Sequence, residues 1–488
     1  MSKLIPVESI LKIVGEENVI SSKAHLISYA LDFRLRRIIT MIKKFKLEDF
    51  LPELVVMPEN TEQVSEIMKI AYENEIPVIP RGAGTSLSGQ LIPVKGGIIL
   101  DFRKMNRILE LNLRARYTVL EPGVYYKKLN KILTENGFWF PPDPGSAELC
   151  TIGGMVANNA SGLRACKYGT TKDYVLGLEV VLPDGKIIKT GSKAQKTSSG
   201  LNLTDLFVGS EGCLGIITKI ILRIVPKPPH EITGVASFKQ FETALEAAYK
   251  VLESGLTPAS MEFLDMLTVS AMNVYLPKEL KLPFAKGTLL IRTDGTLQQA
   301  EEEMKQILKI CEEAGGQTKI FPSKDAEELW NVRAALFQLA ERALQTPESP
   351  KMSSDRIMDI AVPLDKIPEF LSKTRQIAKS YGFTFGSSGH IGDGNVHMRF
   401  MFNMDENGIK KADECEKKII NLALELGGTI TAEHGIGLWK SSILEMEHGN
   451  AIEVMRKIKK ALDPKGILNP GKMALDFIPD VAFLERWL

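Results

Sequence analysis

Apolar and polar positions follow two different periods along the first quarter of the chain. The short apolar runs LVVM (54–57), IPVIP (76–80), GGIIL (96–100) and YTVL (117–120) predict strands. Between the first two, TEQVSEIMKIAYENE (61–75) has apolar residues at helical spacing and polar residues in its first turns. Strands that alternate with helices predict an α/β sheet covered by helices.

The same patterns continue to the end of the chain and indicate several domains. The cluster Pro226–Pro229 marks a boundary after the apolar run GIITKIILRIV. Beyond it, long amphipathic segments, among them 323–345, alternate with strands. We therefore expect an N-terminal helical segment over 1–49, a first domain over 50–228, a second α/β domain over 229–425 and a helical C-terminal segment over 426–488. The expected fold class is α+β / α/β.

Two N-terminal segments are amphipathic. MSKLIPVESILKIVGEENV has glutamates that interrupt its apolar residues, so it predicts a helix and not a signal peptide. Residues 34–46 carry six positive charges and no negative charge, with Leu35, Ile38, Ile39, Ile42 and Phe45 at helical spacing. That basic helix either packs its apolar face on the core or docks on an acidic partner or membrane surface.

Composition narrows the class of protein. Hydrophobic residues make up 44% and charged residues 25% of 488 residues, which is ordinary for a globular protein. The net charge of +1 gives no electrostatic footprint for nucleic acid. Five scattered cysteines without a CxxC pair argue against an internal iron–sulfur cluster and fit a reducing compartment. With no apolar run near the ~20 residues of a transmembrane span, we expect a cytoplasmic protein that reaches a membrane only through a partner.

Two glycine-rich segments are candidate cofactor loops. RGAGTSLSG (81–89) follows a strand directly, and its glycines allow successive backbone N–H groups to converge on an anion. It matches neither GxGxxG nor the Walker pattern, so on its own it is either a tight turn or a phosphate site. A second small-residue segment, 141–169, favours a long cofactor that lies against backbone.

Three of the six histidines lie in glycine-rich surroundings, in SSGHIGDGNVHMRF and TAEHGIGLWK. His390, His397 and Glu433 form a two-histidine, one-carboxylate set, which leaves positions open on a catalytic metal. Imidazole and carboxylate suit zinc, manganese or iron, and the sequence does not choose among them. Alternatively, Glu433 only orients His434.

Four motifs in order resemble the FAD-binding domain of the vanillyl-alcohol oxidase/p-cresol methylhydroxylase flavoprotein superfamily. They are PELVVMPENTEQV, IPVIPRGAGTSLSG, DPGSAELCTIGGMVANNASG and FVGSEGCLGIITKI. The first loop contains no histidine, so the resemblance implies non-covalent FAD. The implied FAD contacts are Arg81, Gly82, Ala83, Gly84, Thr85, Ser86, Pro144, Gly145, Ser146, Thr151, Gly153, Gly154, Asn158, Ser161, Gly162, Glu211, Gly215, Ile216 and Ile217.

The C-terminal half is similar to the FAD-linked D-2-hydroxyacid dehydrogenase branch of that superfamily, which includes D-lactate dehydrogenase, the glycolate oxidase catalytic subunit and D-2-hydroxyglutarate dehydrogenase. GHIGDGNVH (389–397), EHGIG (433–437) and LNPGK (468–472) carry the resemblance. It implies that His390, His397 and Glu433 bind a divalent metal and that His434 is the base. It also implies that Arg333 and Asn395 hold the substrate and that Asn469 touches the flavin, with the C-terminal segment closing on it.

The implied reaction is oxidation of a small D-2-hydroxy acid, D-lactate or glycolate, to the 2-oxo acid. The metal lowers the pKa of the substrate hydroxyl, His434 removes its proton, and hydride moves to flavin N5. For a second substrate carboxylate, Arg342 and Lys351 are available, but no clear motif marks them.

Electrons then pass to an external acceptor, such as an iron–sulfur subunit, an electron-transferring flavoprotein, a quinone or oxygen. Two alternatives remain: a transferase similar to alkylglycerone-phosphate synthase, and a non-catalytic flavin electron-transfer subunit.

Overall fold

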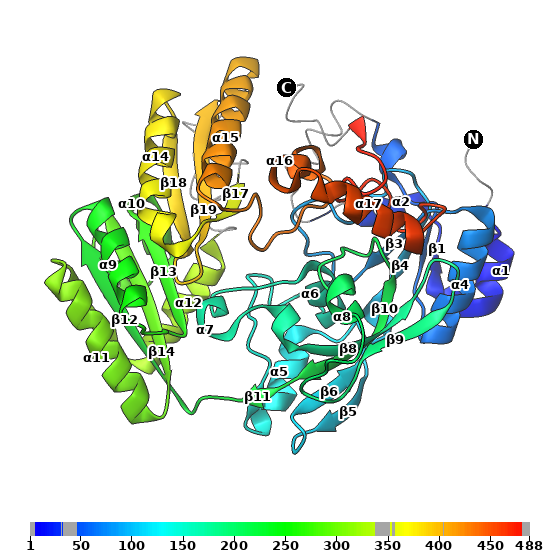
Figure 1. Ribbon diagram of the computed structural model, residues 1–488, viewed down its shortest axis with the longest axis horizontal. Helices are drawn as coiled ribbons and strands as arrows, with labels where there is room; N and C mark the ends of the chain where they lie inside the picture. The colour runs from blue at the N-terminus through cyan, green and yellow to red at the C-terminus, as the bar shows by residue number, and fades with distance from the viewer. Residues whose placement is uncertain are drawn as a thin grey trace.

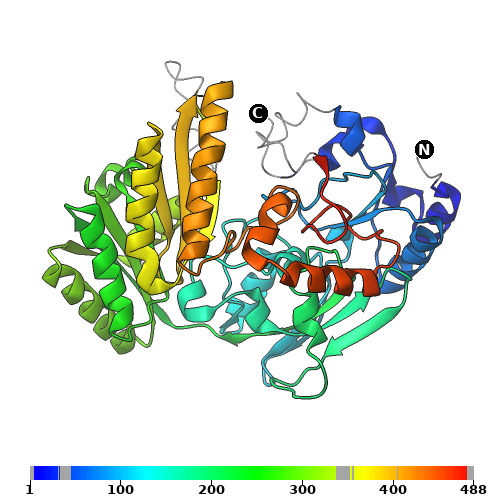
Figure 2. The same ribbon diagram turned by 45° about the horizontal axis from the view of Figure 1, so that its top comes forward.

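A computed structural model describes residues 5–30, 32, 46–336, 352–353, 357–403 and 405–480. The chain forms two halves that lie side by side, with the C-terminal segment lying against the first half (Figures 1 and 2). The expected helix near the N-terminus is confirmed as α1 (Val7–Val14), with Ile10 and Val14 buried. Of the basic segment 34–46, only Lys46 belongs to the described residues, and Arg342 and Lys351 also lie outside them.

The first half contains two sheets. One has the order β1 (Val19–Ile20), β2 (Leu54–Val56), β4 (Ile98–Asp101), β3 (Val78–Arg81), and its last three strands are parallel. Helix α4 (Thr61–Asn74) connects β2 to β3, and the Asn60 side chain caps it by accepting from the Gln63 N–H. The glycine-rich loop at 82–89 therefore starts at the carboxyl end of a buried parallel strand, where ligands commonly bind in such sheets.

The other sheet of this half is antiparallel, in the order β5 (Ile108–Asn112), β6 (Tyr117–Leu120), β10 (Ile216–Arg223), β8 (Val175–Val181), β9 (Ile187–Gly191). Three further elements position the second glycine-rich segment. They are α5 (Tyr126–Glu135), α6 (Ile152–Asn158) and α7 (Ala165–Tyr168). Smaller elements are α2 (Lys23–Tyr29), α8 (Leu203–Phe207) and the strand pair β7 (Phe138–Trp139) and β11 (Val225–Pro226).

The second half is one large antiparallel sheet. Its order is β15 (Gln317–Phe321), β12 (His230–Phe238), β14 (Gly287–Gly295), β13 (Ser260–Asp265), β18 (Thr384–His390), β19 (Asn395–Asn403), β16 (Met352–Ser353), and β17 (Ile357–Ala361) also pairs with β19. One face packs on α9 (Phe241–Glu253), α11 (Leu297–Glu313), α14 (Ile367–Ser380) and α15 (Glu406–Glu425). The other face carries α10 (Met266–Tyr275) and α12 (Ser323–Ala334) and is turned toward the first half.

The C-terminal segment returns to the first half. Helices α16 (Leu444–His448) and α17 (Ala451–Leu462) precede a loop that joins the edge of β3, where the Val78 N–H donates to the Ile467 carbonyl at 2.8 Å. Buried Lys459 anchors α17, because its Nζ donates to the Cys213 carbonyl at 2.8 Å. No described helix combines the length and apolar character that crossing a membrane requires.

Candidate active site

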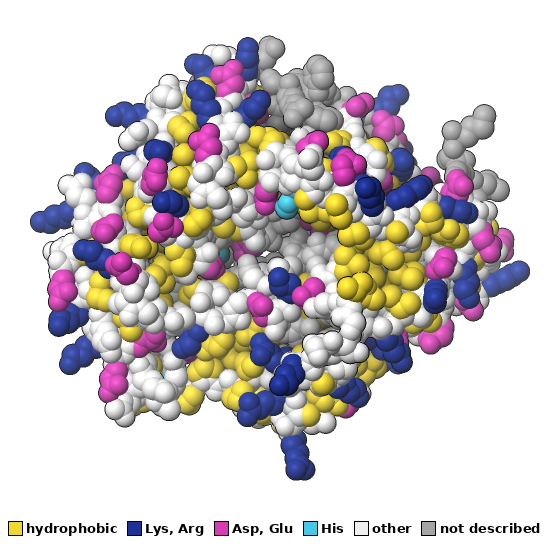
Figure 3. Space-filling view, viewed as in Figure 1, with side chains coloured by type: hydrophobic (Ala, Val, Ile, Leu, Met, Phe, Trp, Pro, Cys, Tyr) yellow, Lys and Arg dark blue, Asp and Glu magenta, His cyan; other side chains and the backbone are white. Residues whose placement is uncertain are grey.

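A cavity of about 1170 Å³ lies between the two halves and is lined by residues of both. It exceeds the roughly 300–1,000 Å³ of most small-molecule pockets, so it has room for a dinucleotide and a substrate together. In the view of Figure 3 the surface is hollowed where the two halves meet. Both glycine-rich segments and three of the six histidines line this one space.

The first glycine-rich loop presents hydrogen-bond donors to the cavity. The backbone N–H groups of residues 83–87 donate to no described residue, and the buried Ser86 Oγ also has no partner there. Donors in a cavity wall that lack a protein partner need a ligand or water to satisfy them. A Cβ at Gly82 would lie 2.3 Å from Thr151 Oγ1, so the two loops meet too closely for any side chain there. This donor-rich cradle fits the diphosphate of FAD.

Most of the cofactor residues predicted from the sequence line the cavity. The lining includes Arg81, Gly82, Ala83, Gly84, Thr85, Ser86, Pro144, Gly145, Ser146, Thr151, Gly153, Gly154, Asn158, Ser161, Gly162, Glu211, Gly215 and Ile217. Ile216 does not, because alternation along β10 turns it into the core behind β2 and β4. Asn469 does not either, since its Nδ2 donates to the carbonyls of Gln90 and Glu211 at 3.0 and 2.8 Å and so joins two loops.

The structure brings the three predicted metal ligands together. Nε2 of His390, at the end of β18, lies 3.3 Å from Nε2 of His397 on β19. Oε1 of Glu433, on the loop after α15, lies 3.7 and 3.3 Å from these two nitrogens. Donors held about 2.0–2.1 Å from a tetrahedral ion are separated from one another by roughly 3.4 Å. The set therefore fits a small divalent ion with an open position.

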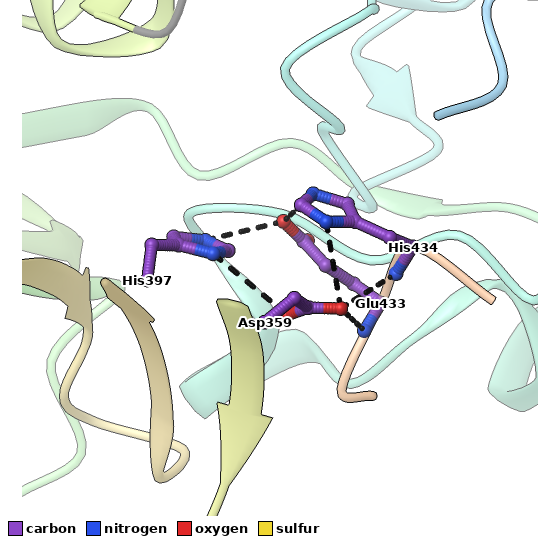
Figure 4. A group of neighbouring side chains, drawn as sticks. All are labelled: Asp359, His397, Glu433 and His434. Carbon is purple, nitrogen blue, oxygen red and sulfur yellow. Dashed lines mark hydrogen bonds and ion pairs between the residues drawn. The ribbon is translucent and has the colours of Figure 1, made fainter. Parts of the chain in front are cut away.

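His434 lies beside His397 and Glu433 (Figure 4). Its Nε2 lies 3.4 Å from the same Glu433 oxygen, and its ring stacks on His397 with centroids 5.4 Å apart. A base at the position of His434 would therefore lie next to a ligand bound at the open position of the ion. The group Asp359, His397, Glu433 and His434 also places four donor atoms within 4.8 Å of one another, so Asp359 is a further side chain that could hold a metal ion here.

Asp359, which sequence reasoning missed, holds the loop that carries Glu433 and His434. Its Oδ2 accepts from the backbone N–H groups of Ala432, Glu433 and His434 at 3.2, 3.0 and 2.9 Å. The predicted substrate residue Asn395 does not line the cavity and instead donates to Asp359 Oδ1 at 2.8 Å. A carboxylate inside the apolar strand IMDIA was the available sequence signal for Asp359.

Arg333 lines the cavity but is already paired. Its guanidinium NH2 lies 2.5 Å from Oε2 of Glu262, a fully buried carboxylate on β13. Its Nε is buried and has no hydrogen-bond partner among the described residues, so a donor remains for a ligand. Arg399 is another cation in the lining, and sequence reasoning missed it. It lies two residues after His397 on β19, hence on the same face, which the strand period could have shown.

Charge pairing determines the protonation of the cluster. Burial favours neutral His390, but the carboxylates of Glu262 and Glu433 outweigh it and hold the pKa of His390 well above its ordinary value. Burial likewise opposes the charge on Glu433, yet hydrogen bonds from the three histidines hold its pKa well below the usual range. His397 has a lowered pKa, mainly because it is buried. Glu433 and Glu262, whose pKa values are both lowered, thus stay ionised beside the histidines.

The cofactor loops directly contact the loop that carries Glu433 and His434. Asn158 Nδ2 donates to the Glu433 carbonyl at 2.7 Å, and Ser161 Oγ donates to Glu433 Oε2 at 3.2 Å. The Glu211 carboxylate accepts from the N–H groups of Ile436 and Gly437 at 2.7 and 2.8 Å. These contacts fix the distance between the two parts of the site.

Two family models match this chain. The model described as FAD binding domain covers residues 52–191, and the model described as FAD linked oxidases, C-terminal domain, covers residues 227–473. They confirm that the chain has both halves of an FAD-linked oxidase, as the sequence motifs predicted.

Curated relatives cover most of the chain. Glycolate oxidase subunit GlcD of Bacillus subtilis is 36% identical over 96% of this chain and 96% of its own. The D-lactate dehydrogenase of Archaeoglobus fulgidus is 38% identical over 86% of this chain and 91% of its own, and the probable mitochondrial D-lactate dehydrogenase of Danio rerio is 37% identical over 86% and 84%.

Solved structures share the fold. p-Cresol methylhydroxylase with substrate bound matches with a TM-score of 0.74 at 19% identity, over 96% of both chains. Alkyldihydroxyacetonephosphate synthase matches with a TM-score of 0.77 at 21% identity, over 95% of this chain and 84% of its own. At these identities the likeness concerns the fold alone, and it confirms the predicted fold class.

Proposed function

The chain belongs to the FAD-linked oxidases, as an oxidoreductase of the D-lactate dehydrogenase and glycolate oxidase type, and we propose that it oxidises a small D-2-hydroxy acid to the 2-oxo acid. D-Lactate and glycolate are the proposed substrates. The observation that carries the proposal is the position of Glu433 Oε1, within 3.3–3.7 Å of three histidine Nε2 atoms in a cavity that the cofactor loops also line. Bound FAD supplies the hydride acceptor.

His390, His397 and Glu433 are the proposed holders of a zinc, manganese or iron ion. Such an ion lowers the pKa of a hydroxyl that binds it. The cluster itself supports this assignment, because two imidazole nitrogens 3.3 Å apart repel through their lone pairs unless a cation or proton lies between them. The ionised Glu433 at their centre favours the cation.

The chain's own residues then move the proton and hold the acid. His434 Nε2 would take the proton of the substrate hydroxyl as the Cα–H bond breaks, and bound FAD would supply the acceptor for the hydride. Asp359 Oδ2, 3.6 Å from His434 Nδ1, stabilises the imidazolium that results. Arg333, through its remaining donors, and Arg399 are proposed to pair with the substrate carboxylate. Electrons leave for a separate acceptor of the kinds named above, and a cytoplasmic location stays a prediction.

An anaerobic titration of the FAD-loaded protein tests the proposal. We expect one of D-lactate, glycolate or D-2-hydroxyglutarate to bleach the flavin absorbance stoichiometrically, and L-lactate to leave it unchanged. A bound flavin that none of these acids reduces would contradict the proposed activity.

A further inference from the structure

Glu262 contacts two functional side chains at once. It lies on β13 and its side chain is fully buried. Oε1 accepts from His390 Nδ1 at 2.6 Å, and Oε2 lies 2.5 Å from the Arg333 guanidinium. One carboxylate therefore links a proposed metal ligand to a proposed substrate-binding residue.

The sheet register produces this arrangement. Glu262 and His390 are directly opposite residues of the antiparallel strands β13 and β18. The flanking residues Met261 and Phe263 point into the apolar core on the helical face, so alternation directs Glu262 to the cavity face. An apolar residue would pack at this position at least as well as a carboxylate, so packing does not explain the glutamate.

The close contact determines which nitrogen of His390 carries the proton. A carboxylate paired with an arginine is ionised and only accepts hydrogen bonds, so Nδ1 must donate. In the neutral form of His390, Nε2 is then the lone-pair nitrogen that can bind a cation, and it faces His397 Nε2 at 3.3 Å and Glu433 Oε1 at 3.7 Å. The other two histidines have no contact of this kind, since their Nδ1 atoms lie 3.7 and 3.6 Å from Asp359.

We propose that Glu262 is a positioning residue for both functions of the site. It orients His390 so that Nε2 faces the metal position, and it aims the Arg333 guanidinium at the substrate carboxylate. The inference rests on the proposed function, because it assumes the metal site. It goes further in assigning one buried residue to the coupling of metal binding and acid binding.

The alternative is a carboxylate that only stabilises the fold. The variant E262Q distinguishes the two, because glutamine has nearly the same shape but its single oxygen accepts from only one partner. Its amide N–H then faces the other donor. The measurement is the dissociation constant of Mn²⁺ for the FAD-loaded, chelator-treated protein, by calorimetric titration, together with the thermal midpoint and the KM for the acid.

Asp265 provides a matched control on the same strand. It is buried, and its two oxygens accept from the N–H groups of Thr268 at 2.8 Å and Ser387 at 2.6 Å. D265N therefore loses a comparable hydrogen bond without touching His390 or Arg333. A purely structural role for Glu262 predicts that both variants behave alike.

We expect E262Q to weaken Mn²⁺ binding about 10- to 100-fold, because loss of a residue that orients a metal ligand typically has an effect of this size. We also expect E262Q to raise KM. D265N should lower the thermal midpoint and leave the Mn²⁺ constant unchanged. E262D, which keeps the charge, should recover part of the affinity, and it also serves if E262Q does not fold. Wild-type Mn²⁺ affinity in a folded Glu262 variant would overturn the inference. A wild-type protein that binds no Mn²⁺ would overturn it together with the metal part of the proposed function, whereas the flavin titration tests the acid oxidation separately.

Discussion

Asp359 and His397 are directly paired residues of the antiparallel strands β17 and β19, and Oδ1 of the aspartate lies 3.7 Å from Nδ1 of the histidine. The second oxygen of Asp359 accepts from the backbone of the loop that carries Glu433 and His434. One buried carboxylate thus joins the strand that carries His397, a proposed metal ligand, to the loop that carries His434, the proposed base. The site depends on this connection, because its residues come from distant segments of the chain.

Replacement of His434 tests the base directly. H434A should slow flavin reduction by about 10²- to 10⁴-fold, because general-base catalysis contributes that much. FAD content and Mn²⁺ affinity should stay close to wild type. Stopped-flow absorbance measures the reduction rate, and H25A is the control, since His25 is an exposed histidine on α2 that does not line the cavity and whose ring contacts Ser22. Near-wild-type reduction by H434A would show that another group takes the proton.

Arg399 should affect binding of the acid more than the chemical step. Its position in the cavity lining beside His397 suits a substrate carboxylate, and a hydrogen bond to a charged group contributes about 1.5–3 kcal/mol. R399M should therefore raise KM roughly 10- to 150-fold, which steady-state kinetics will measure. R375M is the control, because Arg375 is exposed on α14, on the opposite face of the sheet. An unchanged KM for R399M would show that Arg399 does not bind the substrate carboxylate.

Gly82 tests the close approach of the two cofactor loops. G82A should lower FAD affinity, since the new Cβ would lie 2.3 Å from Thr151 Oγ1 and force the loops apart. The double variant G82A/T151A removes that oxygen and should regain part of the affinity. Flavin fluorescence on titration of the apoprotein measures both constants. An effect of G82A that T151A does not relieve would show that the contact is not the cause.

Glu211 should make stability fall as pH rises through the acid range. Burial raises the pKa of this carboxyl to about 7 in the folded protein, against 4.5 ordinarily. Between these values the folded state binds more protons than the unfolded state, so raising the pH favours unfolding. The stabilising contribution is full below about 4.5 and lost above about 7. Urea unfolding of wild type and E211Q at pH 5 and pH 7.5 should show a steeper decline in the wild type than in E211Q, which keeps Asp393, another carboxyl whose pKa is raised by burial.

The cofactor loops and the histidine motifs could be predicted because their chemistry is local in sequence. Glycine flanks mark close backbone approach, and GHIGDGNVH and EHGIG contain all three proposed metal ligands and the base. Ile216 shows the limit of a motif, because strand alternation decided which of two adjacent residues faces the cavity. The sequence motif likewise predicted that Asn395 holds the substrate, whereas in the structure its side-chain amide donates to Asp359.

Asp359 and Glu262 could not be assigned from the sequence because their roles arise from strand register. Each lies opposite a histidine, Asp359 across from His397 and Glu262 across from His390. Nothing in the linear pattern states which strands pair, or in which register. A carboxylate within an apolar strand was the available signal, and it indicates a candidate residue but not the residue with which it interacts.

The proposed metal-dependent oxidation is tested most directly by the rate of anaerobic flavin reduction with and without the metal. FAD-loaded protein is treated with a chelator, mixed with D-lactate or glycolate in a stopped-flow instrument, and then supplied again with Zn²⁺, Mn²⁺ or Fe²⁺. We expect the chelator to abolish bleaching and one of the ions to restore it in the wild type but not in H390A. Full reduction by the metal-free protein would contradict the proposal.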